Sequence, residues 1–282
     1  MRTPKFVLSC IAALMLAAPT LSACAAQLTE ERLLRPVAGG TLSQDSVRRV
    51  VPTYTVTEHS IVAPDGARLH AVLLRQPGAR GTVLYFGGNA YSMERFGAAT
   101  AAEFAPLGVD LMLVDHRGYG LSQGRATVGS LETDGAAAFD YLAGLPGIDR
   151  AHIIVHGQSL GSFTAGYVAA HRDTAGVVLE SSVTSTEDWV GAVMGPSVTI
   201  APSLRGRGNL RHMAAITEPL LLLVGEADRQ TPARLSQGLF TASTLPPSRK
   251  LLSIIPGANH NDVMLHPGAI DAYRSFLALV LP

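Results

Sequence analysis

Cysteine is nearly absent from the 282-residue sequence. The two cysteines, Cys10 and Cys24, both fall in the first 24 residues, so the rest of the chain holds no pair that could form an intramolecular disulfide bond. A folded body must therefore be held together by its hydrophobic core. The composition favours such a core, because 47% of the residues are hydrophobic and only 16% are charged.

The sequence also has no excess of positive or negative charge. Lys and Arg together number 22, Asp and Glu together number 22, and no long run of either sign occurs. The basic patch or stripe that nucleic-acid binding requires is missing from this pattern. The sequence therefore predicts a small-molecule or lipid-like partner and no nucleic acid, and it does not specify an oligomeric state.

Motifs for metals and cofactors are also missing. The histidines show no H-x-x-x-H or comparable spacing, so a zinc site is not expected. The glycine-rich FGGNA stretch at 86–90 lacks the lysine of a phosphate loop, and no G-x-G-x-x-G opens a helix after a strand. We therefore expect no metal and no cofactor.

The first 23 residues have the layout of a secretory signal peptide. Basic residues precede an apolar run at 6–18, which is too short to span a bilayer, since a membrane helix needs about 20 apolar residues. The segment predicts export from the cytoplasm and cleavage of the leader.

The stretch LSAC at 21–24 resembles a bacterial lipobox. That resemblance implies cleavage before Cys24, lipidation of this cysteine and attachment to a membrane of the cell envelope. Ordinary cleavage after Ala25 or Ala26 is the alternative and would give a soluble secreted protein. An uncleaved membrane anchor is the third possibility.

The remaining sequence is predicted to form a tether over 24–52 and one α/β domain over 53–282. Two segments with alternating apolar residues, 54–63 and 67–75, flank Pro64-Asp65-Gly66 and indicate an antiparallel hairpin. Short, nearly continuous apolar runs follow, which is typical of parallel strands that are buried on both faces. These runs occupy 81–86, 109–116, 151–156, 176–181, 219–225 and 250–256.

Helical segments are expected between these strands, at 92–104, 130–143, 160–171, 232–240 and 262–279. Alternation of strand and helix predicts right-handed crossovers and a mostly parallel, doubly wound sheet.

One segment, 181–217, interrupts the alternation and is predicted to be a lid insertion. We expect Trp189 and Met194, with Val190 and Val193, to form an apolar wall above a substrate site; plain packing of the insertion is equally compatible. A cluster of arginines, Arg205, Arg207 and Arg211, is interpreted as a solvated face, with an anion-recognition patch as the alternative.

The pentapeptide Gly157-Gln158-Ser159-Leu160-Gly161 follows a predicted strand and opens a predicted helix. It matches the G-x-S-x-G nucleophile elbow, in which glycines let strand and helix approach closely while the serine hydroxyl faces solvent. An ordinary glycine-lined turn is the alternative interpretation. The sequence predicts Ser159 as a nucleophile.

Two further polar residues follow predicted strands. Asp228 comes after the run at 219–225, and His260 comes after the last run. The order Ser, Asp, His is that of the α/β-hydrolase triad, and reactive groups collect beyond the carboxyl ends of parallel strands. A solvated or helix-capping carboxylate is the alternative role for Asp228, and Glu226 and Glu180 are the alternative acids.

These residues together resemble a serine hydrolase of the α/β-hydrolase superfamily, close to its small lid-bearing esterases and thioesterases, over about 54–282. The D-x-R-G-x-G-x-S segment that begins at Asp115 adds to the resemblance, and we expect Asp115 and Arg117 to brace loops beside the site. The resemblance also implies backbone oxyanion donors at Asn89 and Leu160, with Gly88 as fallback. The match is partial there, because a glycine stands where the family usually has histidine.

The roles follow from the chemistry of the side chains. Ser159 would attack an acyl carbon, His260 would take its proton, and Asp228 would orient the imidazole and stabilise its charge. The sequence thus predicts a serine hydrolase that cleaves carboxylic esters or thioesters through an acyl-enzyme. A peptidase or amidase with the same triad, or an inactive binding protein on a hydrolase scaffold, is the alternative.

Overall fold

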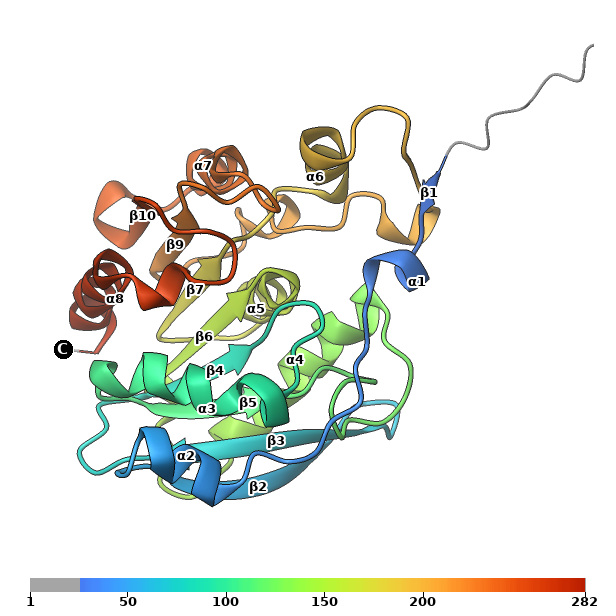
Figure 1. Cartoon of the computed structure of the whole chain (residues 1–282). Coiled ribbons are helices and arrows are strands. Elements are labelled where there is room, and N and C mark those ends of the chain that lie inside the picture. The colour runs from blue at the N-terminus through green and yellow to red at the C-terminus, as the bar shows by residue number, and fades with distance from the viewer. Residues whose placement is uncertain (1–25, 282) are drawn as a thin grey trace, which may run out of the picture.

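The computed structural model describes residues 26–281, which fold around a twisted eight-stranded sheet (Figure 1). The strand order is β10-β9-β7-β6-β4-β5-β3-β2. Only β2 and β3 are joined to their neighbours in antiparallel pairing, and all other neighbours pair in parallel. The strands are β2 (Thr55–Val62), β3 (Arg68–Arg75), β4 (Thr82–Phe86), β5 (Asp110–Val114), β6 (Ile153–Gln158), β7 (Gly176–Glu180), β9 (Leu220–Gly225) and β10 (Lys250–Ile255).

The strands lie where the sequence predicts them, and the hairpin β2-β3 is confirmed. Gly66 adopts φ +86° at its turn, where a residue with a Cβ would be strained. Every residue of β4, β5, β7 and β9 is buried. This burial explains the continuous apolar runs, because helices cover both faces of the sheet.

Helices α3 (Met93–Phe104) and α8 (Pro267–Val280) pack on one face of the sheet, and α4 (Val128–Ala143), α5 (Leu160–His171) and α7 (Ala233–Ala242) pack on the other. The prediction for the last helix was wrong at its start, since α8 begins at Pro267 and not at 262. The residue before a proline is disfavoured in helical conformation, and His266 is accordingly extended, with ψ 134°.

The described part of the predicted tether is a packed segment, which corrects the prediction for residues 26–52. It contains β1 (Gln27–Leu28), α1 (Glu30–Leu33) and α2 (Gln44–Val50). Figure 1 shows it running from the insertion down one side of the domain to β2. Five of its apolar side chains are buried against the domain, which a mobile spacer would not allow; they are Leu28, Leu34, Leu42, Val47 and Val51.

The insertion between β7 and β9 contains α6 (Thr186–Val193) and β8 (Thr199–Ile200). The strand β8 pairs in parallel with β1, so the N-terminal segment and the insertion form a small two-stranded sheet. Two segments that are far apart in the sequence thus meet beyond the carboxyl ends of the central strands (Figure 1).

The predicted signal peptide, 1–23, and the predicted lipidation site, Cys24, lie outside the described residues. Within residues 26–281 no helix is long and apolar enough to cross a membrane.

Candidate active site

Ser159 occupies a sharp turn between β6 and α5. Its backbone angles are φ 51° and ψ −113°, a region that residues with a Cβ rarely adopt. The Ser159 N–H donates to the carbonyl of Glu180 at 2.9 Å, and the Ser162 hydroxyl donates to the Ser159 carbonyl at 2.6 Å. Such strain persists only where the surroundings over-determine it, and it is common at functional sites.

Close contacts with neighbouring backbone atoms require glycine at both ends of the pentapeptide. A Cβ at Gly157 would lie 2.2 Å from the carbonyl oxygen of Gly161, and a Cβ at Gly161 would lie 2.0 Å from the carbonyl oxygen of Phe86. Both distances are well below van der Waals contact with rigid backbone atoms. The glycines therefore let α5 pack directly on β6 and β4, as the sequence pattern indicates.

The structure brings the three predicted reactive residues together. The Ser159 hydroxyl oxygen lies 2.9 Å from Nε2 of His260, and Nδ1 of the same ring lies 2.8 Å from Oδ2 of Asp228. The three side chains come from the ends of β6, β9 and β10, which are separated in sequence but meet at one edge of the sheet. This arrangement can pass a proton from the hydroxyl to the imidazole.

Asp228 is fully enclosed and well supplied with hydrogen bonds. Its side chain has 0% exposure, and its Oδ1 accepts from the backbone N–H groups of Gln230 and Thr231, both at 2.8 Å. Burial opposes ionisation, but the bonds and charge of His260 and the bonds from Thr231 outweigh it, so the pKa of the Asp228 carboxyl is lowered. The carboxylate is thus ionised at neutral pH, and it both caps its own loop and faces the imidazole.

The alternative acids are engaged elsewhere. Glu226 accepts from the Gly257 N–H at 3.2 Å, and Glu180 accepts from Nε2 of the buried His156 at 3.0 Å. His156 also stacks on Tyr273, with ring centroids 5.7 Å apart. His156 is thus a packed core residue.

Two backbone N–H groups beside Ser159 are free to bind an oxyanion. Within residues 26–281 no acceptor bonds the N–H of Asn89 or of Leu160, and both residues line the same cavity as the serine. Leu160 is the first residue of α5, so its N–H lies beyond the reach of the helical ladder. Gly88, which the sequence predicts as the fallback donor, also lines this cavity, and a Cβ there would lie 2.2 Å from the side-chain oxygen of Gln158.

The loop that carries Asn89 is held by a buried histidine. Burial lowers the pKa of His116, so its ring is neutral and its Nε2–H donates to the Gly87 carbonyl at 2.7 Å. Asp115 accepts from the Met93 N–H at 3.0 Å, which fixes the start of α3. Arg117 donates to Asp134 at 2.7 Å as well as to Asp65. The bracing role predicted for Asp115 is confirmed by its contact, whereas Arg117 braces the β2-β3 turn against α4.

A cavity of about 510 Å³ opens above the serine. Trp189 and Met194 from the insertion line it, as the sequence predicts, and the Trp189 indole N–H donates to the Gln230 carbonyl at 2.8 Å. That bond links α6 to the loop that holds Asp228. Val193 also lines the cavity, whereas Val190 is 4% exposed and packs in an apolar cluster that includes Phe163 of α5.

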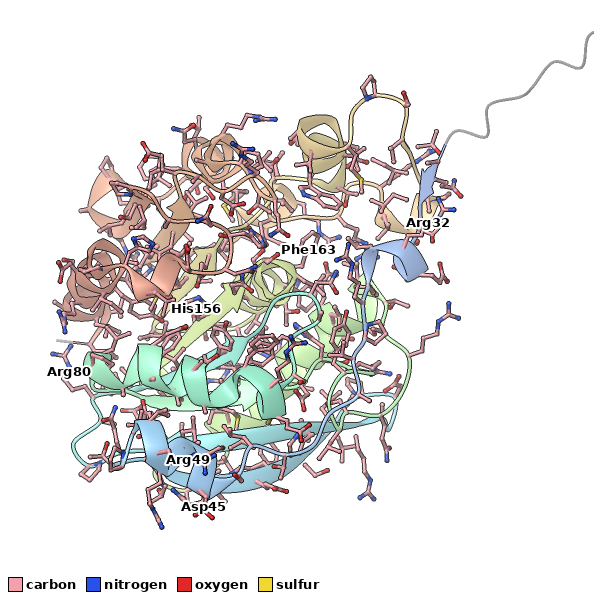
Figure 2. All side chains as sticks on the ribbon, viewed as in Figure 1. Arg32, Asp45, Arg49, Arg80, His156 and Phe163 are labelled. Carbon is pink, nitrogen blue, oxygen red and sulfur yellow. The ribbon has the colours of Figure 1, made fainter. Side chains whose placement is uncertain are left out.

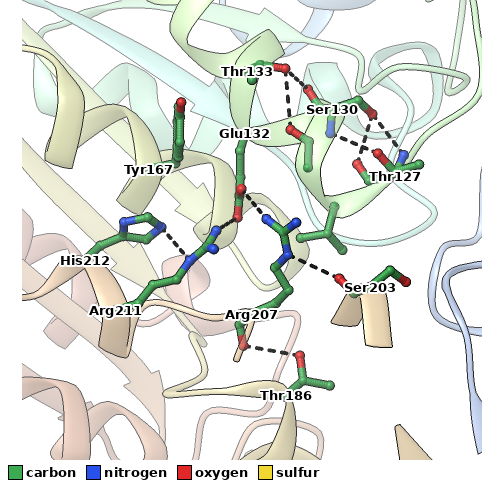
Figure 3. A network of polar contacts seen from close by, with 12 residues as sticks. Thr127, Ser130, Glu132, Thr133, Tyr167, Thr186, Ser203, Arg207, Arg211 and His212 are labelled. Atoms are coloured by element: carbon green, nitrogen blue, oxygen red, sulfur yellow. Dashed lines mark hydrogen bonds and ion pairs between the residues drawn. The ribbon is translucent and has the colours of Figure 1, made fainter. Parts of the chain in front are cut away.

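The insertion is fastened to α4 by an ionic network (Figure 3). Arg207 donates to Glu132 at 2.8 Å, and Arg211 also donates to this buried carboxylate. Burial raises the pKa of Glu132, although both arginines oppose the shift. The interpretation of the three arginines as a solvated face is therefore wrong for the partly buried Arg207. It holds for Arg205 and Arg211, which are exposed, although Arg211 also pairs with Glu132.

The described residues contain no cluster of three or more His, Cys, Asp or Glu side chains that could hold a metal ion.

Comparisons with known proteins identify the family of this chain. A family model described as serine aminopeptidase, S33 matches residues 77–210. The uncharacterized protein Rv2307c of Mycobacterium tuberculosis is 35% identical over 203 residues, covering 71% of this chain and 70% of that protein. The α/β-hydrolase domain-containing protein 17B of Xenopus laevis is 27% identical over 214 residues, covering 76% and 72%. The chain belongs to the α/β-hydrolase superfamily.

Solved structures agree with the fold of this α/β-hydrolase. The esterase Pf2001 of Pyrococcus furiosus superposes with a TM-score of 0.70 at 19% identity, covering 88% of this chain and 100% of that one. At this identity the likeness supports the fold alone.

Sequence reasoning missed the contribution of the N-terminal segment to the site of this α/β-hydrolase. Leu33 and Arg35 line the cavity, and their backbone groups bond the side chain of Asn89. Tyr119 also donates to the Asn89 side chain, at 2.9 Å. No sequence motif indicates that this segment contributes to the site, because it has mixed composition and lies more than 100 residues before the serine.

A second missed residue is Gln158, the variable position before Ser159. Its side-chain amide donates to the carbonyl of His260 at 3.2 Å and so helps to hold the imidazole loop. The elbow pattern leaves this position unspecified, so no sequence signal marks it.

Proposed function

We propose that this α/β-hydrolase is a serine hydrolase that cleaves carboxylic esters or thioesters through an acyl-enzyme on Ser159. The observation that carries the proposal is the unbroken pair of contacts from the serine hydroxyl through His260 to Asp228 at the floor of a cavity. A hydroxyl is a weak nucleophile unless a base removes its proton, and this contact supplies the base.

The steps follow from the positions of the atoms. The Ser159 oxygen bonds the acyl carbon while its proton moves to Nε2 of His260, and the ionised Asp228 stabilises the imidazolium. The imidazolium then gives the proton to the leaving oxygen or sulfur as that bond breaks. Water attacks the acyl-enzyme, with His260 again taking the proton, and releases the carboxylic acid.

The N–H groups of Asn89 and Leu160 are the proposed donors to the tetrahedral oxyanion. They are preorganised, since Asn89 is tied to the N-terminal segment and Leu160 begins α5. Removal of one such donor in an enzyme of this type costs about 2.7–4 kcal/mol of transition-state stabilisation.

An amidase or peptidase is the second candidate, favoured by the description of the matching family model. An aminopeptidase must bind a cationic amine beside the scissile bond, which calls for acidic side chains in the cavity. The residues that line the cavity include none. We therefore rank ester cleavage above peptide cleavage.

We also propose that the protein is exported and anchored to an envelope membrane through a lipidated Cys24. The lipobox-like LSAC stretch supports this proposal. The soluble secreted form remains the alternative. Metabolic labelling with a fatty acid separates the two, because a Cys24→Ala variant should lose both the label and the membrane fraction.

The test of the activity uses purified protein from residue 25 onward. Wild type should hydrolyse 4-nitrophenyl butyrate much faster than the matched 4-nitroanilide, and Ser159→Ala should abolish both reactions. Ser248→Ala is the matched control, since Ser248 is exposed and distant from the cavity lining. Faster anilide than ester cleavage would favour the peptidase, and a folded wild type without activity would favour the inactive scaffold.

A further inference from the structure

The cavity above Ser159 carries positive charge on its rim. Three arginines line it, Arg32 and Arg35 from the N-terminal segment and Arg229 from the loop after β9, and no Asp or Glu side chain is among the lining residues. All three arginines are exposed at the surface. The cavity therefore differs in charge from the chain as a whole, which has equal numbers of basic and acidic residues.

These rim arginines have no carboxylate partner within residues 26–281. The Arg32 side chain makes one hydrogen bond, to the Gln27 carbonyl at 2.9 Å. The acidic residues of α1 are engaged away from the cavity, because Glu31 pairs with Arg125 and Glu30 accepts from the Val128 N–H. The guanidinium groups on the rim are thus available to an anion, unlike those that Glu132 neutralises.

The inner wall of the same cavity is apolar. It is formed by Phe163 of α5 and by residues of the insertion, chiefly Val183, Trp189, Val193 and Met194. Val193 and Met194 are 42% and 45% exposed, although both are large and apolar. Figure 2 shows Arg32 on the outer side of α1 and Phe163 nearer the centre of the molecule. A ligand that satisfies both surfaces has an apolar chain and an anionic head.

We propose that the substrate is an acyl ester of an anionic, phosphate-bearing alcohol. This proposal rests on the proposed function and names its substrate class. The acyl chain lies against the apolar wall, and the alcohol faces the arginines.

The chemistry of the site supports this orientation of the substrate. His260 must hand its proton to the leaving oxygen, so the alcohol departs on the imidazole side of the site. Arg229 directly follows Asp228, which holds that imidazole. In the reaction the Ser159 oxygen bonds the acyl carbon, the bond from that carbon to the alcohol oxygen breaks, and water releases the acid. The products are a carboxylic acid and the free phosphate-bearing alcohol.

The test compares two esters with the same acyl chain, 1-octanoylglycerol 3-phosphate and 1-octanoylglycerol, both below their micelle concentrations. Wild type should show at least tenfold higher kcat/KM for the phosphate ester. The double variant Arg35→Gln/Arg229→Gln should lose roughly tenfold of kcat/KM toward the phosphate ester, as expected for lost contacts to a charged group. The ratio of its kcat/KM values for the phosphate ester and the neutral ester should therefore fall roughly tenfold relative to wild type.

Arg249→Gln is the charge-matched control, because Arg249 is exposed and does not line the cavity. It should leave the preference unchanged, whereas added salt should reduce the preference of the wild type by screening. A third substrate, mono-4-nitrophenyl suberate, carries its anion on the acyl chain and is compared with 4-nitrophenyl octanoate.

The possible outcomes separate the proposed substrate class from the proposed esterase function. Equal or better cleavage of neutral octanoylglycerol overturns the substrate class while the esterase function stands. Preference for the suberate over the octanoate, without preference for the glycerol phosphate ester, places the anion on the acyl side and also overturns the proposal. Failure to cleave any of the four esters removes the proposed function itself.

Discussion

Ser159 shows how single residues fix this site. Its left-handed backbone is tolerated because glycines on both sides remove the contacts that a helix packed so closely on a strand would otherwise make. The sequence pattern alone predicts this turn, since the steric demand acts within five residues. The position of the Asn89 backbone donor is harder to predict, because it depends on contacts from His116 and from the N-terminal segment.

A substitution at Gly161 tests the close packing. Gly161→Ala would place a Cβ 2.0 Å from the Phe86 carbonyl oxygen, so β4, β6 and α5 must separate. We expect a loss of about 3 kcal/mol in the free energy of unfolding, at the upper end for overpacking, measured by urea denaturation. Gly191→Ala is the matched control, because nothing lies within 4 Å of that Cβ. Equal stability of the two variants would contradict the steric account.

A substitution at Asp228 tests the charge behind the imidazole. Asp228→Asn keeps the shape but removes the carboxylate, whose lowered pKa keeps it ionised at neutral pH. The amide would favour the wrong imidazole tautomer, and we expect kcat to fall about 10⁴-fold with little change in fold, as in serine proteases with this change. Stopped assays with a 4-nitrophenyl ester and circular dichroism measure both. A loss below tenfold would show that another residue serves as the acid.

At the scale of elements, two segments enclose the site, and neither belongs to the regular alternation of strand and helix. The N-terminal segment and the insertion pair through β1 and β8, and each is also tied to the domain by polar contacts. The sequence locates the insertion by the long gap between apolar runs. It does not reveal the packing of residues 26–52, because the buried leucines there are widely spaced and follow no helical or strand period.

The bond between Asn89 and the N-terminal segment is tested by Asn89→Leu. This variant keeps the backbone N–H but loses the side-chain bonds to Arg35, Leu33 and Tyr119. Each lost bond leaves a polar group unpaired, so we expect the segment to open more often and trypsin to cleave between Arg32 and Leu33 about tenfold faster. Mass spectrometry of timed digests gives the rate. An unchanged rate would mean that apolar contacts alone hold the segment.

The anchor of the insertion on α4 is tested by Glu132→Gln. This change removes the charge that both Arg207 and Arg211 face in a buried setting. We expect a loss of about 2 kcal/mol in the free energy of unfolding, since uncompensated half-buried arginines remain. Glu58→Gln is the control, because its side chain is 55% exposed and should change stability by less than about 0.5 kcal/mol. The network contributes little if both variants unfold at the same urea concentration.

At the scale of the whole molecule, the sequence predicts the α/β-hydrolase fold well, because each buried parallel strand corresponds to a short apolar run in the sequence. Ser159, Asp228 and His260 could be found in the same way, since each comes soon after the end of one of the strands that these runs form. The charge of the cavity could not be found, because Arg32, Arg35 and Arg229 come together only when the N-terminal segment folds over the carboxyl ends of the strands.

The central claim is that the hydroxyl of Ser159 is made nucleophilic by convergence of three strand ends. A fluorophosphonate probe reports this directly, because it reacts with activated serines, and tryptic mass spectrometry locates the adduct. Folded wild type and Ser248→Ala should be labelled on Ser159, and Ser159→Ala should remain unlabelled. Labelling of Ser159→Ala to the level of wild type, or no labelling of the folded wild type, would contradict the claim.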